Sequence, residues 1–116
     1  GGRVYAWRYF EWLAQTEWGR SVQLMNNVAW LAATDGQTPP EIAARAALFA
    51  ERAVELTGGT VAPVLDTLAV ARAAAGDFAG AVEVGERALA LSKDPAEAAG
   101  IRARLELYRA GKPFRE

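Results

Sequence analysis

Glycine, proline and helix-capping residues divide this chain into six short stretches, and this spacing constrains the fold more than any other feature of the sequence. Apolar residues recur within the stretches at helical spacing, and no stretch shows sustained alternation of apolar and polar residues, so we expect helices and no strands. The linkers are short, which favours antiparallel packing of consecutive helices. The six predicted helices span residues 3–18, 22–34, 38–57, 60–76, 78–92 and 94–111. The third, fourth and sixth ranges include the residues that cap the helix.

Polar side chains stand where a helix start needs an acceptor for its free backbone amides. The expected capping residues are Ser21, Thr38, Thr60, Asp77 and Asp94. Glu41 and Glu97 follow two of these caps at the spacing of a capping box. Glycines close most of the predicted helices, as expected for residues that leave a helix in the left-handed conformation.

Composition excludes several classes of function. Thirteen Lys and Arg residues against 14 Asp and Glu residues give a net charge of -1, which argues against a nucleic-acid-binding module. The chain has no His and no Cys, so it lacks the commonest general base, the commonest metal ligand and any thiolate nucleophile. We therefore expect no enzyme activity, no cofactor and no metal site. No uncharged run approaches the ~20 residues of a membrane-spanning helix.

Two of the predicted helical hairpins repeat each other. Asn27-Val28-Ala29 aligns with Thr67-Leu68-Ala69, 40 residues later, and Glu51–Leu56 aligns with Glu86–Leu91, 35 residues later. The difference is an insertion near Gly36 in the first hairpin. A period of about 34 residues built from two helices is the signature of a tetratricopeptide array.

The second hairpin carries the clearest pattern. Its matching residues are Leu65, Leu68 and Ala69, the turn Gly76-Asp77-Phe78, and the small residues Ala81 and Ala88. With these, residues 62–95 resemble one tetratricopeptide repeat (TPR), although Arg72 and Gly85 stand where that family has aromatic residues. Residues 22–57 resemble a looser copy, and residues 94–111 resemble the helix that closes many bacterial TPR arrays.

The resemblance implies a single all-α domain over residues 1–116, in which antiparallel hairpins stack as a short TPR-like solenoid of six helices. In order, it consists of an aromatic N-terminal helix (1–19), repeat 1 (22–57), repeat 2 (60–92) and a capping helix (94–111). It also implies a concave surface lined by the first helix of each hairpin. The predicted groove residues are Gln23, Asn26, Asn27, Trp30, Asp66, Thr67 and Val70.

This groove could hold an extended peptide by its backbone, with Trp30 as an apolar anchor. The alternative is structural: Asn27 bonds to a neighbouring helix, and Trp30 packs in the loop after its own helix. The family's carboxylate clamp is not expected, because Asn26 and Asp66 occupy positions where basic residues would be needed.

The first predicted helix holds six of the eleven aromatic residues of the chain. They fall on two sides of the helix, and a helix that is apolar on two sides is normally buried on both. It could be a core helix, an interface between copies of the chain, or a helix lying on a membrane surface. We favour the interface, through Tyr5, Trp7, Tyr9 and Trp12.

The sequence therefore predicts a non-enzymatic scaffold for protein interaction and assembly. The favoured form self-associates through the aromatic helix into a ring or filament. The alternative is a partner- or peptide-binding module from the C-terminal part of a longer TPR protein. The Arg- and Ala-rich repeats resemble bacterial ones. A chain that begins with Gly1 rather than Met fits an exported or cell-surface product or a cloning remnant, and the compartment stays open.

Overall fold

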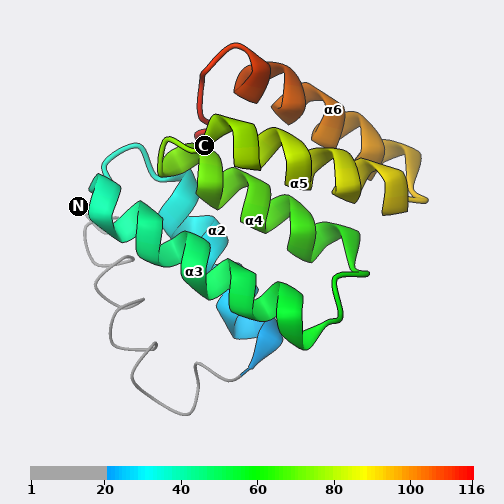
Figure 1. Ribbon diagram of the computed structural model, residues 1–116, viewed down its shortest axis with the longest axis horizontal. Helices are drawn as coiled ribbons and strands as arrows, with labels where there is room; N and C mark the ends of the chain where they lie inside the picture. The colour runs from blue at the N-terminus through cyan, green and yellow to red at the C-terminus, as the bar shows by residue number, and fades with distance from the viewer. Residues whose placement is uncertain (1–20) are drawn as a thin grey trace.

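The computed structural model describes residues 21–116, which form five α-helices and contain no strand. The helices are α2 (Val22–Thr34), α3 (Pro40–Leu56), α4 (Ala62–Ala74), α5 (Phe78–Leu91) and α6 (Pro95–Arg109). The all-α expectation is confirmed for this part of the chain (Figure 1). The predicted helix over residues 3–18 lies outside the described residues.

Three of the predicted helix caps are present. The side chains of Ser21 and Asp77 accept hydrogen bonds from the amides of Leu24 and Gly80, at 3.4 and 2.9 Å. The side chain of Asp94 accepts one from the Ala96 amide at 3.0 Å. These bonds satisfy amides that have no partner inside the helix, and they begin α2, α5 and α6 where the sequence predicts.

The other two predicted caps, Thr38 and Thr60, are wrong. Helices α3 and α4 begin one residue later than expected, after Pro39 and Val61, with no side-chain cap. The Thr60 hydroxyl donates instead to the Thr57 carbonyl at 3.2 Å. Proline in the first turn of each helix removes one of the amides that a cap would satisfy, so these helices need the cap less.

Helix α4 is the centre of the fold. Consecutive helices pack against each other, and α4 also contacts α2 and α6, so that it touches each of the other four helices (Figure 1). Within residues 21–116, α2 packs only on α3 and α4. Ten of the thirteen residues of α4 are therefore buried.

Small side chains bring the helices close together. Ala29, Ala69, Ala53 and Ala88, which align in the two sequence repeats, are all fully buried. Gly85 allows α6 to approach α5 closely: a Cβ atom there would lie 2.7 Å from Cδ2 of Leu105 and 3.9 Å from Cβ of Ala69. The glycine that departs from the TPR pattern therefore makes room for Leu105 of α6.

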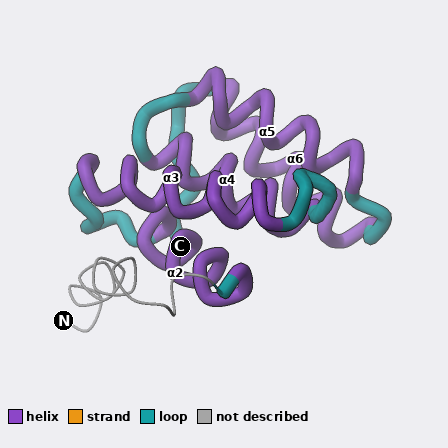
Figure 2. The backbone as a smooth tube through the Cα atoms, turned by 60° about the horizontal axis from the view of Figure 1, so that its bottom comes forward, coloured by secondary structure: helices purple, strands orange, loops and turns teal. Residues whose placement is uncertain are grey.

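After α6 the chain returns to α2. One Nη atom of Arg115 donates to the carbonyls of Ala33 and Asp35, both at 3.1 Å, and the Glu116 amide donates to the Thr34 carbonyl at 3.0 Å. Carbonyls at a helix C-terminus lack partners inside the helix, and a cation is favourable there. Figure 2 shows the C-terminus beside α2. We call residues 112–116 the C-terminal tail.

Candidate functional site

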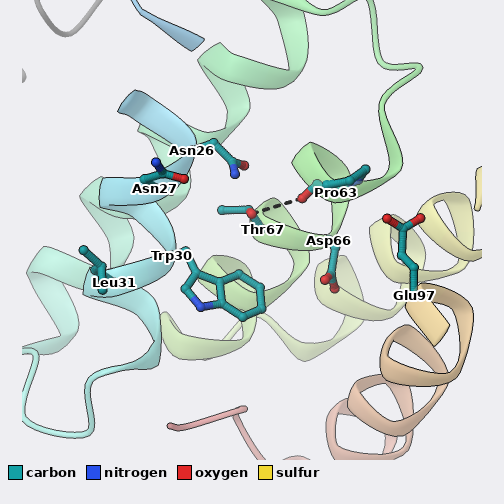
Figure 3. A pocket seen from close by; sticks show the side chains of 8 residues that line it. All are labelled: Asn26, Asn27, Trp30, Leu31, Pro63, Asp66, Thr67 and Glu97. Carbon is teal, nitrogen blue, oxygen red and sulfur yellow. Dashed lines mark hydrogen bonds between the residues drawn. The ribbon is translucent and has the colours of Figure 1, made fainter. Parts of the chain in front are cut away.

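A pocket of about 480 Å³ opens where α2, α4 and the start of α6 meet. It falls within the ~300–1,000 Å³ typical of ligand sites. Its described lining consists of Asn26, Asn27, Trp30, Leu31, Pro63, Asp66, Thr67 and Glu97 (Figure 3). The sequence repeat explains this grouping, because Asn26 and Asn27 of α2 align with Asp66 and Thr67 of α4.

The α2 side of the pocket combines amides with an apolar wall. Asn27 Oδ1 accepts a hydrogen bond from Gln23 Nε2 of the same helix at 3.1 Å. Asn26 Oδ1 is buried and has no hydrogen-bond partner among the described residues. Trp30 turns its indole ring toward the pocket (Figure 3), and Leu31 is 55% exposed. This side can therefore contact apolar groups and, through the exposed carboxamide of Asn27, form hydrogen bonds with a ligand.

The α4 side holds a buried ion pair. Nε and Nη2 of Arg104 in α6 donate to the two carboxylate oxygens of Asp66 at 3.0 and 2.7 Å. The side chains of Arg104 and Asp66 are only 17% and 10% exposed. This bidentate geometry is the strong form of such a pair. It also commits Arg104, which is therefore not available to bind an anionic ligand.

Burial shifts two acidic groups in this region. Loss of solvent raises the pKa of the Asp66 carboxyl above its ordinary value, and the hydrogen bonds and charge of Arg104 oppose that shift in part. Burial, with a smaller contribution from the Asp66 carboxylate, raises the pKa of Tyr108. The Tyr108 hydroxyl has no hydrogen-bond partner among residues 21–116. Both pKa values are raised because Asp66 in α4 and Tyr108 in α6 are buried where these two helices pack together.

Arg104 also contacts two aromatic rings. Its guanidinium carbon lies 5.5 Å from the ring centroid of Trp30 and 5.3 Å from that of Phe114 in the C-terminal tail. The two rings are 5.8 Å apart and tilted by 53°. Trp30 Nε1 donates to Glu116 Oε1 at 3.3 Å. Cation–π and aromatic contacts therefore hold Trp30 in place from the side of the tail.

The structure brings together five of the seven predicted groove residues: Asn26, Asn27, Trp30, Asp66 and Thr67. Gln23 is exposed and reaches the site only through its bond to Asn27. Val70 is a correction, because it is fully buried in the core and cannot contact a partner. The structural alternative is also wrong in detail: Asn27 bonds within its own helix, and Trp30 packs on the tail rather than in the following loop.

Sequence reasoning missed Leu31, Pro63 and Glu97 in the pocket, and Arg104 and Phe114 behind it. Glu97 was expected to complete a capping box, but it accepts a hydrogen bond from Ser92 Oγ at 2.6 Å. Arg104 is 38 residues from Asp66 in sequence, and no local pattern marks that pair. One signal could have indicated Glu97 and Arg104, namely an alignment of the last helix with the first helices of the two repeats.

The predicted self-association residues Tyr5, Trp7, Tyr9 and Trp12 lie outside the described residues. Within residues 21–116, no group of three or more acidic side chains is arranged to hold a metal ion. None of the five helices has the length and apolar character to cross a membrane.

No family model, curated protein sequence or solved structure matches this chain. The TPR assignment therefore rests on the sequence repeat alone.

Proposed function

We propose that this chain is a non-enzymatic protein-interaction module that binds an extended peptide segment in the pocket between α2, α4 and α6. The observation that carries the proposal is the pocket itself, which places the apolar side chains of Trp30 and Leu31 beside the carboxamides of Asn26 and Asn27. A peptide offers both matching features, because its side chains can contact Trp30 and Leu31 while its backbone can hydrogen-bond to the exposed carboxamide of Asn27.

The preformed state of the pocket supports the same proposal. Arg104, Phe114 and Glu116 all contact the Trp30 ring or its indole nitrogen, so the ring is held before any partner arrives. Ordering a side chain in advance lowers the entropy cost of binding. The pocket is lined by α2 and α4, which contact each other, and these are the first helices of the two hairpins that the sequence repeat defines.

The experiment is an NMR titration of the ¹⁵N-labelled chain with a pooled library of blocked octapeptides. We expect shifts concentrated on the side-chain amides of Asn26 and Asn27 and on the Trp30 indole. Leu31→Ser should weaken this binding about tenfold, because it removes an apolar contact from the pocket wall. The matched control is Leu48→Ser in α3, which is 65% exposed and outside the pocket lining.

Equal binding by the wild type and the Leu31→Ser variant would contradict the proposal, as would shifts scattered away from the pocket. Both leucines are largely exposed, so neither substitution should affect folding.

Self-association through the aromatic N-terminal segment stays a prediction from the sequence. Light scattering over a wide concentration range tests it directly. An assembling chain should gain mass with concentration and lose that growth with Tyr9→Glu or Trp12→Glu. A mass that stays at 12.4 kDa would reject it and leave the pocket proposal intact.

A further inference from the structure

The described wall of the pocket carries two carboxylates and no basic side chain. Its described lining includes the carboxylates of Asp66 and Glu97 and the unpartnered Oδ1 of Asn26, but no Lys or Arg. The Thr67 hydroxyl donates to the Pro63 carbonyl at 3.1 Å, so its proton is already in use. The carboxamides of Asn26 and Asn27 offer N–H donors as well as oxygen acceptors, so it is the two carboxylates that favour a ligand with a cationic donor.

The charges lead to the same conclusion. Asp66 is paired with Arg104, whereas Glu97 makes no ion pair with any residue of the described range. Glu97 accepts only the hydrogen bond from Ser92, and a carboxylate has capacity for several more. Its charge is also felt at Asp66, where it contributes to the raised pKa. Among the described residues of this edge, Asp66, Glu97 and Arg104 together carry one negative charge in excess.

The apolar wall lies across the pocket from these carboxylates. Figure 3 shows Trp30 and Leu31 on the α2 side, and Asp66 and Glu97 on the α4 and α6 side. A ligand that fills the pocket must therefore present an apolar group on one side and a cationic group on the other. A basic side chain next to an apolar one in a peptide meets this requirement. A metal ion would leave the apolar wall unused.

We infer that the pocket selects peptides in which a Lys or Arg residue neighbours a large apolar residue, with the basic group bound to Glu97 beside Asp66 and the apolar side chain against Trp30 and Leu31. This inference rests on the proposed function and adds the charge of the partner. Its physical basis is the match between an unpaired carboxylate and a cation at a partly desolvated edge.

The test compares two pooled libraries of blocked octapeptides. Each peptide carries one Leu followed by a charged residue, which is Lys or Arg in the first library and Asp or Glu in the second, among otherwise neutral residues. We expect the basic library to bind at least tenfold more tightly, judged from shifts of the Trp30 indole and the Asn26 amide. Added salt should weaken the basic library selectively.

The variant Glu97→Gln keeps the size of the side chain and its capacity to accept from Ser92, so the fold should be preserved. It should weaken binding of the basic library about tenfold, because a charge-assisted hydrogen bond becomes a neutral one. Glu83→Gln in α5 is the matched control, since Glu83 is exposed and outside the pocket lining. It should bind the basic library as the wild type does.

The possible failures can be distinguished. Equal binding of the two libraries, or unchanged binding by Glu97→Gln, would overturn the inferred charge preference and leave peptide binding in place. Preference for the acidic library would overturn it outright. If neither library shifts the pocket resonances at millimolar concentration, both this inference and the proposed function are rejected.

Discussion

Helices α2 and α4 occupy equivalent positions in the two sequence repeats, yet they differ in how much of their surface is covered. Ala29 of α2 and Ala69 of α4 are both fully buried, so the repeat correctly places the side that faces the partner helix. One position later the helices diverge: Trp30 is partly exposed at the pocket, whereas Val70 is fully buried.

The difference follows from the number of neighbours. Helix α4 is covered by α6 as well as by α2, α3 and α5, whereas α2 has only α3 and α4 against it in the described part of the chain. An internal repeat therefore predicts which residues face the second helix of a hairpin. It does not predict which residues remain available to a ligand, because that depends on what lies beyond the next helix.

The largest difference in stability between variants of α4 and α2 should appear when one leucine in each helix is replaced by alanine. Leu65 of α4 is fully buried and Leu31 of α2 is 55% exposed. Leu65→Ala should lower the free energy of unfolding by about 3 kcal/mol, because it removes buried methyl groups and leaves a cavity. Leu31→Ala should change it by less than about 0.5 kcal/mol. Urea unfolding followed by circular dichroism measures both, and similar losses would contradict the assigned difference in burial.

The Asp66–Arg104 pair is the polar part of the cover on α4. Asp66→Ala should destabilise the fold by about 2–3 kcal/mol, because it leaves a largely buried guanidinium without its partner. The double variant Asp66→Leu/Arg104→Met should recover most of that loss, since burial opposes the charged form of Asp66 and two apolar residues avoid that cost. Chemical denaturation of the wild type, Asp66→Ala and the double variant measures the two changes in stability. A double variant as unstable as Asp66→Ala would show that the pair stabilises the fold strongly.

Close packing of α6 depends on Gly85. Gly85→Val should cost about 2 kcal/mol, because the added atoms overlap Leu105 in a filled core. Gly36→Val is the control, since a Cβ at Gly36 meets no atom within 4 Å. Thermal unfolding compares the two. If Gly85→Val were as stable as the wild type, α6 could move outward at little cost, and its packing against the rest of the fold would not be tight.

The tail provides α2 with part of the cover that α6 provides for α4. Phe114→Ala should cost about 1 kcal/mol, the usual value of an aromatic pair, through its contacts with Trp30 and Arg104. It should also shift the indole NH resonance of Trp30. Lys112→Ala in the same tail is exposed and serves as the control. An unchanged Trp30 resonance in Phe114→Ala would show that the tail does not order the ring.

The smallest expected effect is on pH dependence. Because burial raises the pKa of Asp66 above 3.8, the folded protein keeps this proton to a higher pH than the unfolded chain does. Between the two pKa values the folded state binds more protons, so the contribution of Asp66 to stability declines as pH rises through that interval. The measurement is the free energy of unfolding as a function of pH for the wild type and for Asp66→Asn. Their difference isolates the contribution of the Asp66 carboxyl. If the wild type instead became more stable relative to Asp66→Asn as pH rises, the pKa of Asp66 would be lowered in the folded state rather than raised.

The helices could be predicted from the sequence because their signals are local. Asp77 and Asp94 cap the helices that follow them, and Gly76 adopts the positive φ of 91° expected at a helix end. The caps at Thr38 and Thr60 failed because proline had already removed an amide that needed a partner, and sequence spacing alone does not weigh the two effects.

The site could be predicted only in part. Asn26, Trp30 and Asp66 were found because the repeat places them on adjacent first helices. Glu97 and Arg104 were missed because their roles depend on how α6 packs against α4, which involves residues more than 30 positions away. The same difference in cover explains the error at Val70, since α4 packs against four of the described helices and α2 against only two of them.

The return of the tail to α2 has a consequence for cooperativity. In a stack where each helix touches only its neighbours, the terminal helix can fray while the rest stays folded. Here the segment after α6 is bonded to the end of α2 through Arg115 and Glu116, so α6 and the tail cannot detach together without also breaking contacts with α2. Hydrogen exchange at the amides of α6 should therefore approach the rate set by global unfolding.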